Sequence, residues 1–312
     1  MIESIDELRA LLADSEWQDA ACVRLQMPGH AQSALAVEVA PYDAVSAWRY
    51  LRERIAATGR WPVVTAAWTG HGAWAGNMTE ADFFCRFEYG HARPGKPKDQ
   101  SAQAILARSR DVDIDGFLQD CDGYWEARID EFIEFQLEAM VHRRGNAPDR
   151  ADAERAAATV AAPKCRAVER FLLDWEIAQS GLPEVLDEAD LTYLEWFEPR
   201  GQPMALLLMP FTRGSELLAH MHWFGAGSIS SETAIAFLRR WEDRYGAELV
   251  AHFGTILQMT VARKPADIDE AFDLAWEHER VAPCTTALPG VSVRDHAKAL
   301  LKTDRWFLHE RP

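Results

Sequence analysis

The stretch from Ser230 to His278 constrains the fold most, because it combines two amphipathic helices with two short strands. Ser230 and Ser231 are typical helix-capping residues, and Gly246 stands where a left-handed residue commonly closes a helix. Between them, apolar side chains recur at spacings of three and four and share one helical face. These side chains are Ala234, Phe237, Leu238, Trp241 and Tyr245.

Two strands and a second helix follow. Residues 249–251 are a short apolar run, and in residues 256–261 the apolar side chains alternate with polar ones, as in a strand with one buried face. Asp267 and Glu270 have the spacing of a capping box, which predicts a helix over residues 268–280. The order helix, strand, strand, helix is typical of an α/β protein.

The N-terminal part of the chain has a similar mixture of elements. Residues 22–25, 34–39 and 61–68 have the apolar character of strands, and a helix is predicted over residues 43–57. Residues 204–209 are continuously apolar, as in a strand that is buried on both faces. The sequence therefore predicts an α/β (α+β) fold in which the N- and C-terminal parts build one mixed sheet with flanking helices.

The middle of the chain is predicted to be a mostly helical lobe. Its longest predicted helix covers residues 124–142, with acidic side chains lying off an apolar stripe. The stripe consists of Trp125, Ile129, Phe132, Ile133, Leu137, Met140 and Val141. We therefore expect three segments: an N-terminal α/β part over 1–97, a helical insertion over 98–183 and a C-terminal α/β part over 184–312. Residues 191–197 alternate loosely, as a strand would.

The run Phe-Leu-Arg-Arg-Trp-Glu-Asp-Arg-Tyr-Gly-Ala-Glu-Leu-Val, residues 237–250, resembles the hallmark of a bacterial family described only as domain of unknown function 4253. Further similar pieces are Ala47–Arg52, Thr58–Val63, Thr260–Pro265, Ala275–His278 and a short terminal helix ending at Trp306-Phe307. The resemblance covers both ends of the chain and omits its helical middle. It implies a fold but no activity.

The chain departs from that family pattern at two places. Ala282-Pro283-Cys284 stands where the family has Cys-Pro-Asp, and His309-Glu310 stands where it has Trp-Asp. Any chemistry that those family residues carry is therefore expected to be absent here.

The charge balance limits the classes of partner. The net charge is −16, with 49 acidic residues against 33 basic ones. Non-specific binding to nucleic acid relies on Lys and Arg at phosphates, so we expect no nucleic-acid partner. An acidic chain attracts basic proteins, although solubility alone also explains such a surface. No apolar run is long enough to cross a membrane, and residues 1–6 lack the features of a signal peptide, so a cytoplasmic location is expected.

Two histidines suggest a metal site. His220 and His222 are two residues apart, a spacing that places both rings on one face of a strand, and Glu277 and His278 are candidates to complete a divalent metal site. The alternative, histidines hydrogen-bonded within the structure, stays open. The cysteines have no paired spacing, which predicts reduced thiols without a disulfide framework or a zinc ribbon. They are Cys22, Cys85, Cys121, Cys165 and Cys284.

The leading functional hypothesis is a non-catalytic protein that binds another macromolecule, a basic protein, through an acidic face containing tryptophan. Trp is enriched at binding hot spots, so Trp74 and Trp223 are candidate binding residues. Trp241, Glu242 and Arg244 in the family-like run complete that set. Neutralisation of a toxin, as by an immunity protein, is one concrete version. The alternatives are a metal-dependent or small-molecule enzyme that uses the His/Glu cluster and a structural homo-oligomer. No cofactor is expected other than that metal.

Overall fold

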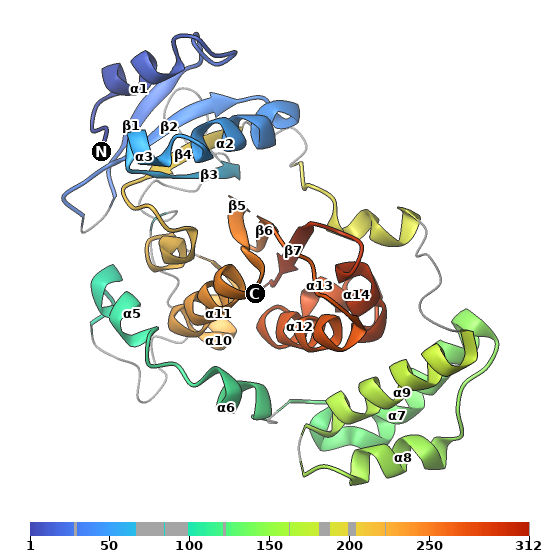
Figure 1. Ribbon diagram of the computed structural model, residues 1–312. Helices are drawn as coiled ribbons and strands as arrows, with labels where there is room; N and C mark the ends of the chain where they lie inside the picture. Colours follow the sequence, from blue (N-terminus) through green and yellow to red (C-terminus); the bar gives the residue numbers. More distant parts are fainter. Residues whose placement is uncertain are drawn as a thin grey trace. The chain divides into compact units, whose positions relative to one another are not determined.

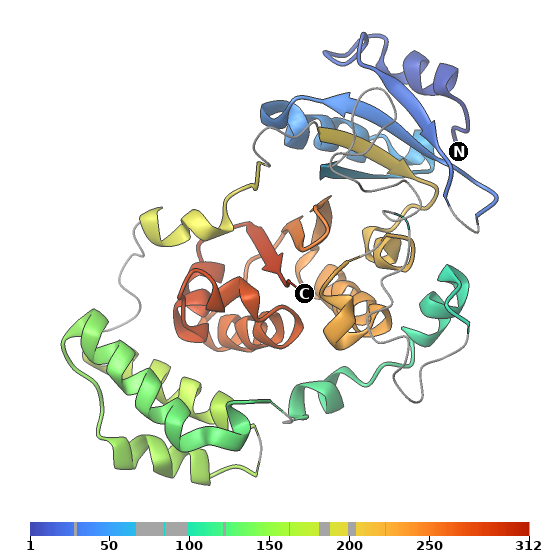
Figure 2. The ribbon, with the colours of Figure 1, turned by 180° about the vertical axis from the view of Figure 1, so that it is seen from behind.

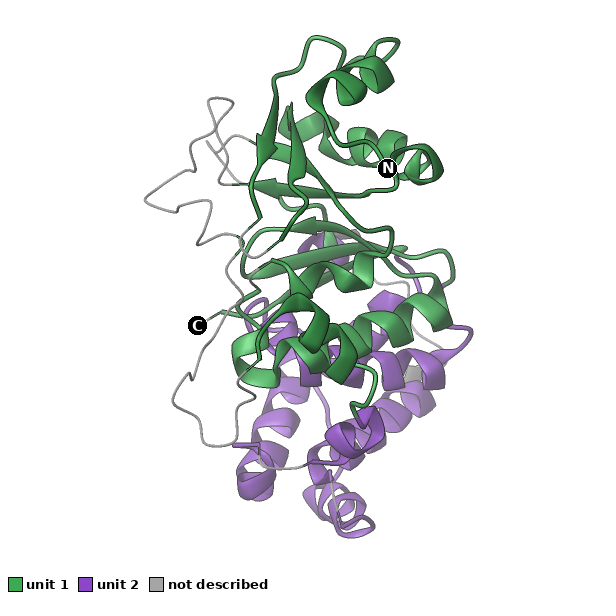
Figure 3. Cartoon of the chain, turned by 90° about the vertical axis from the view of Figure 1, so that its left-hand side faces the viewer, with its two compact units in different colours: residues 1–112, 194–263, 304–312 green, residues 113–193, 264–303 purple. Residues whose placement is uncertain are grey.

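The computed structural model describes residues 1–27, 30–66, 84, 99–120, 123–161, 163–180, 188–198, 204–221 and 223–311 (Figure 1). The chain forms two compact units, which Figure 3 shows in different colours. The sheet unit consists of residues 1–112, 194–263 and 304–312, and the helical unit consists of residues 113–193 and 264–303. Residues 264–303 thus fold with the helical middle, whereas the sequence grouped them with the C-terminal α/β part.

The sheet unit contains a seven-stranded sheet with the order β1-β2-β4-β3-β5-β6-β7. Its strands are β1 (Cys22–Leu25), β2 (Ala34–Val39), β3 (Trp61–Ala66), β4 (Met204–Met209), β5 (Glu248–His252), β6 (Ile256–Thr260) and β7 (Arg305–His309). Neighbouring strands are antiparallel except β3 and β5, which are parallel. The prediction of one mixed sheet built from both parts of the chain is therefore confirmed.

Strand β4 lies between β2 and β3 because its apolar run suits a strand that is covered on both faces. All six of its side chains are buried. Leu208 is opposite Leu35 of β2 and Met209 is opposite Trp61 of β3. Helix α2 (Ala44–Arg52) crosses one face of this part of the sheet (Figures 1 and 2). The indole nitrogen of Trp48 on α2 donates to the carbonyl of Pro62 at 3.0 Å.

The capping signals around the family-like run are confirmed. The Ser230 hydroxyl accepts from the Thr233 amide at the start of α11 (Ser231–Tyr245), and Gly246 closes that helix with a φ of 61°. The Asp267 carboxylate accepts from the Glu270 amide at the start of α12 (Ile268–Val281). On the buried face of α11, Trp241 and Tyr245 pack edge-on against Trp306 of β7, with ring centroids 6.1 and 5.3 Å apart.

Three predictions of local structure are corrected. The strand predicted over residues 191–197 is absent, and its first four residues belong to the 3-10 helix η3 (Glu188–Leu194). Loose alternation over a short segment does not distinguish a strand from such a helix. His220 does not lie in a strand, because it directly follows the 3-10 helix η4 (Gly214–Ala219). The terminal helix α14 (Val293–Leu300) ends early, and Trp306 lies in β7 instead, where burial alternates with the period of a strand.

The remaining elements are mostly short helices. The sheet unit also contains α1 (Ile5–Leu12), η1 (Pro41–Asp43), α3 (Ile55–Thr58), α5 (Ala102–Arg108) and α10 (Ala226–Ile229). The helical unit also contains α6 (Ile114–Gln119), η2 (Glu126–Arg128), α7 (Ile129–Arg144), α8 (Arg150–Ala158), α9 (Lys164–Ser180) and α13 (Cys284–Ala287). In the described ranges, none of these helices combines the length and the hydropathy that a membrane span requires.

Arg60 ties three parts of the sheet unit together from a buried position. Its guanidinium donates to the carbonyl oxygens of Ile2 at 2.6 Å, Ser33 at 2.8 Å and Leu208 at 3.1 Å. Burial lowers the pKa of Arg60. Its hydrogen-bond acceptors come from the N-terminal segment, from the residue before β2 and from the end of β4. This side chain therefore holds these three segments together at one end of the sheet.

Substitution Arg60→Met should destabilise the sheet unit by about 2–4 kcal/mol, because buried carbonyl groups lose charged donors. The free energy of unfolding in urea measures the effect. Arg49→Met on the exposed face of α2 is the matched control and should change stability by less than about 0.5 kcal/mol. Equal stabilities of the two variants would show that the Arg60 contacts are dispensable.

Candidate functional site

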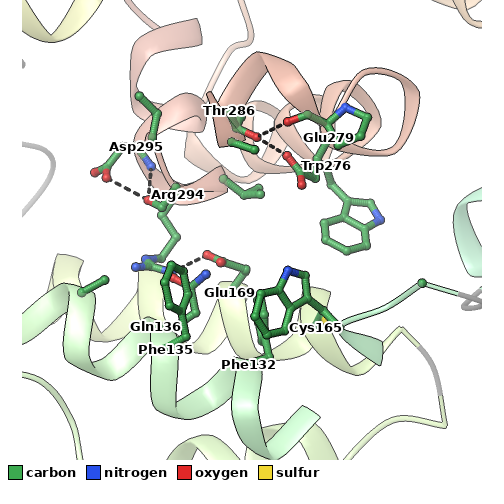
Figure 4. A pocket seen from close by; sticks show the side chains of 18 of the residues that line it. Phe132, Phe135, Gln136, Cys165, Glu169, Trp276, Glu279, Thr286, Arg294 and Asp295 are labelled. Atoms are coloured by element: carbon green, nitrogen blue, oxygen red, sulfur yellow. Dashed lines mark hydrogen bonds and ion pairs between the residues drawn. The ribbon is translucent and has the colours of Figure 1, made fainter. Parts of the chain in front are cut away.

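The helical unit contains a pocket of about 630 Å³. Pockets for small ligands commonly measure about 300–1,000 Å³. Helices α7 and α9 form one side of this pocket, and α12, α13 and α14 form the other (Figure 4). Because all of its lining residues belong to the helical unit, the pocket is defined within that unit alone.

One end of the pocket is aromatic. Figure 4 shows Trp276 of α12 facing Phe132 of α7 and Cys165 of α9. Trp125, just before η2, packs against Phe132 and Phe135, with ring centroids 5.8 Å apart in both pairs. Trp276 is only 8% exposed. The rings therefore supply flat apolar walls on both sides of the pocket.

Part of this aromatic cluster is open to solvent. Tyr124, Trp125 and Phe135 also line the pocket and are 60%, 39% and 56% exposed. We call these three residues the aromatic rim. Tyr124 packs edge-on against Trp125 at 5.1 Å, and Phe135 stacks on Trp125 with an interplanar angle of 20°. Large aromatic side chains grouped at a surface commonly mark an interaction site.

The other end of the pocket is ionic (Figure 4). Buried Arg294 of α14 forms ion pairs with Glu169 and Glu176 of α9, and it donates to the side-chain oxygen of Gln136 at 3.2 Å. Lys298, one turn further along α14, forms an ion pair with Glu176. Burial raises the pKa of the Glu169 carboxyl, and the Arg294 charge opposes that rise. Each buried charge thus has a partner of opposite sign, as burial requires.

Asp295 extends this network toward the surface. It pairs with Arg143 of α7, and its carboxylate lies 3.3 Å from the Lys298 ammonium and 3.9 Å from the Arg144 guanidinium. Burial would raise the pKa of Asp295, but Lys298, the Ser292 hydroxyl and Arg143 outweigh burial and lower it. The charges at the ionic end are therefore used to hold α7, α9 and α14 together.

Two further carboxylates lie at the aromatic end. Glu126 accepts hydrogen bonds from the amides of Lys164 and Cys165 at 2.6 and 3.0 Å, so it caps the start of α9. Glu279 of α12 accepts a hydrogen bond from the Thr286 hydroxyl. Through Glu126, the segment that carries the aromatic rim is fixed to α9.

A chain of hydrogen bonds links the half-buried Tyr193 to two buried histidines of the helical unit, His296 and His278. The Tyr193 hydroxyl lies 2.7 Å from His296 Nδ1, and His296 Nε2 lies 3.0 Å from His278 Nδ1. Burial lowers the pKa of His296 to about 3. Burial, together with the nearby His296, lowers the pKa of His278 well below its usual value. Both imidazoles are therefore neutral at physiological pH.

The predicted metal ligands that the structure describes belong to different units. His220 is in the sheet unit, where its Nδ1 lies 3.1 Å from His30 Nε2 and its ring stacks on Phe211. Glu277 and His278 are buried in α12 of the helical unit. His222 lies outside the described residues. Across the described part of the chain, no group of three or more His, Cys, Asp and Glu side chains is arranged to hold a metal ion.

The predicted binding residues that the structure describes all belong to the sheet unit. Trp223 and Trp241 are buried in the sheet unit, where they contribute to its core. Glu242 accepts from the Ser215 hydroxyl at 3.0 Å and lies 3.1 Å from the Arg213 guanidinium. The Arg244 guanidinium lies over the Tyr245 ring at 5.2 Å. Trp74 lies outside the described residues, as do Cys85 and Cys121, and the described cysteines are free thiols.

Sequence reasoning missed the aromatic rim. It assigned Trp125 to the buried stripe of a helix, but that residue precedes η2 and is partly exposed. One signal was present: Phe135 lies among Glu131, Glu134 and Glu138, on the acidic face of the predicted helix. A phenylalanine on an acidic helical face is a candidate surface contact.

Substitution Arg294→Met should destabilise the helical unit by about 3–5 kcal/mol, because Glu169 and Glu176 lose a buried partner. Arg166→Met on α9, which removes an exposed ion pair with Asp273 of α12, should cost less than about 1 kcal/mol. Denaturant unfolding followed by circular dichroism measures both. Similar losses for the two variants would contradict a structural role for the buried network.

The histidine chain predicts a loss of stability in acid. His278 and His296 stay neutral in the folded unit, whereas unfolded imidazoles bind protons below a pH of about 6.5. Their contribution is therefore fully present above pH 6.5 and is lost as the pH falls below that value, by about 1.4 kcal/mol per pH unit for each histidine. For His296 this loss continues until the pH reaches its folded-state pKa of about 3.

His296→Asn should remove one histidine's share of this pH dependence, as measured by urea unfolding between pH 6.5 and pH 5. His142→Asn, at an exposed position on α7, is the control and should leave the slope unchanged. If the free energy of unfolding of the His296 variant depended on pH as it does in the wild type, a lowered pKa of His296 would be refuted.

A comparison with family models matches residues 205–309 to the domain of unknown function DUF4253. The matched range includes β4 to β7 and α11 to α14, so it supplies one side of the pocket, whereas α7 and α9 lie outside it. Neither the curated proteins nor the solved structures gave a match. Residues 205–309 of this chain thus belong to the DUF4253 family.

Proposed function

We propose that the protein is a non-catalytic binding module whose helical unit docks a basic protein on the aromatic rim. The observation that carries this proposal is the exposure of Tyr124, Trp125 and Phe135 as one packed cluster beside the pocket. Aromatic residues dominate the energetic centres of protein interfaces, because they bury a large area with few rotatable bonds.

The surroundings of the rim support a basic partner. Helix α7 presents the exposed side chains of Asp130, Glu131, Glu134 and Glu138. The whole chain has a net charge of −16, which attracts positively charged proteins over longer distances. Complementary charge mainly raises the association rate, while the buried aromatic contacts slow dissociation. Neutralisation of a basic toxin is one role that fits such a surface.

The ionic end of the pocket supports binding rather than catalysis. Glu169 and Glu176 are bonded to Arg294 and Lys298, so their charges are used to hold helices together. A general acid or base must instead be able to reach the substrate with its proton.

The double variant Trp125→Ala/Phe135→Ala should bind the partner at least about tenfold more weakly than the wild type does. Affinity capture from a lysate of the source cells, followed by titration with the purified captured protein, measures this loss. Binding to the wild type should also weaken as salt is added.

Tyr42→Ala is the control, because Tyr42 is an 80% exposed aromatic residue in the sheet unit. It should leave capture unchanged, and circular dichroism should show that all variants are folded. Undiminished capture by the double variant would place the contact elsewhere, and capture that is indifferent to salt would exclude a basic partner.

A further inference from the structure

We infer that the pocket next to the aromatic rim receives a positively charged side chain of the partner, a guanidinium or an ammonium group. This inference rests on the proposed function, and it adds the chemical class of the group that enters the pocket. Three features carry it: the aromatic walls, the distribution of charge between the two ends and the behaviour of arginines already present in the helical unit.

The aromatic walls favour a cation. The faces of Trp and Phe rings carry negative potential, which attracts ammonium and guanidinium groups within about 6 Å of the ring centre. Trp276 faces Phe132 across the pocket (Figure 4), and Trp125 packs beside Phe132. A cation between these rings would contact aromatic faces from α12 and from α7.

The charges at the aromatic end also favour a positively charged group. Over the whole pocket, lining carboxylates outnumber lining guanidinium groups. Arg143, Arg144 and Arg294 are paired with acids at the ionic end. At the aromatic end, Glu126 accepts only from main-chain amides and has no ion pair within the described ranges. Glu279 adds a second carboxylate on the opposite side.

The guanidinium of Arg280, which also lines the pocket, is directed elsewhere. It donates to the main-chain oxygen of Asp120 at 2.9 Å and lies 5.4 Å from the centre of the Phe117 ring. On the rim itself, Arg128 lies 4.2 Å from the centre of the Tyr124 ring. The helical unit thus already binds its own guanidinium groups on aromatic faces, which is the contact inferred for the partner.

Other occupants fit less well. An anionic side chain would approach Glu126 and Glu279 and be repelled. A neutral apolar side chain would exclude water from the Glu126 carboxylate without supplying a compensating charge, which is costly. A cationic side chain with an apolar stem satisfies both the rings and the carboxylates.

Two small probes test the inference. N-acetyl-arginine amide carries the guanidinium group, and N-acetyl-citrulline amide has nearly the same shape without the charge. Each is titrated into the ¹⁵N-labelled full-length protein, and the indole signals of the tryptophans are followed by NMR. The Trp276 signal is identified by its absence in Trp276→Phe. We expect it to shift with saturation for the arginine probe and to shift little for the citrulline probe.

Charge-removing variants locate the contact. Glu279→Gln retains an oxygen that can accept from the Thr286 hydroxyl, and it should weaken binding of the arginine probe about five- to tenfold. Glu126→Gln should weaken binding to a similar extent. Its single side-chain oxygen can accept from only one of the Lys164 and Cys165 amides, so circular dichroism must show that this variant is folded. Glu138→Gln makes the same charge change on the exposed face of α7 outside the pocket and should leave binding unchanged.

Equal binding of the two probes, or an unmoved Trp276 signal, would overturn the inference. So would an equal loss in the Glu138 control, which would indicate only a general attraction of the acidic surface. These outcomes are separate from the test of the rim: capture that depends on Trp125 and Phe135 would support the proposed function even if the arginine probe did not bind.

Discussion

The insertion of β4 between β2 and β3 is the contact on which the sheet unit depends. Residues 204–209 can take this position because every side chain in the run is apolar and both faces of the strand are covered. Their pairing with Leu35 and Trp61 brings the N-terminal strands against the C-terminal part of the chain. The free edge of β3 then pairs with β5, from which β6 and β7 extend the sheet. Arg60 fixes the end of this arrangement through carbonyl groups of three segments.

The helical unit is organised by charges as well as by an apolar core. Arg294 and Lys298 on α14 are matched by Glu169 and Glu176 on α9, so these helices meet in one defined register. The pocket lies beside this network, with compensated charges at one end and aromatic rings at the other. Since α12 to α14 lie within the DUF4253 match and α7 and α9 lie outside it, family membership alone does not define the pocket.

The sheet could be predicted from the sequence, but the candidate site could not. Local signals of capping and periodicity, such as Ser230, Gly246 and the apolar run of β4, depend only on neighbours along the chain. The pocket depends on contacts between residues far apart in sequence, such as Arg294 with Glu169, for which no local pattern exists. Trp223 and Trp241 show the same limit: composition identifies them as possible anchors, but only packing shows that they are buried. His220 finds its partner in His30, a pairing that spacing within one segment does not suggest.

The helical unit is assembled from two stretches of chain, residues 113–193 and 264–303, and this has a consequence for biosynthesis. On the ribosome, α7 to α9 emerge well before α14, so Glu169 and Glu176 stay hydrated until Arg294 and Lys298 have been made. The sheet unit is likewise completed only by β7. Neither unit can therefore mature as an independent N-terminal body, and both reach their final packing only after α14 and β7 have been made.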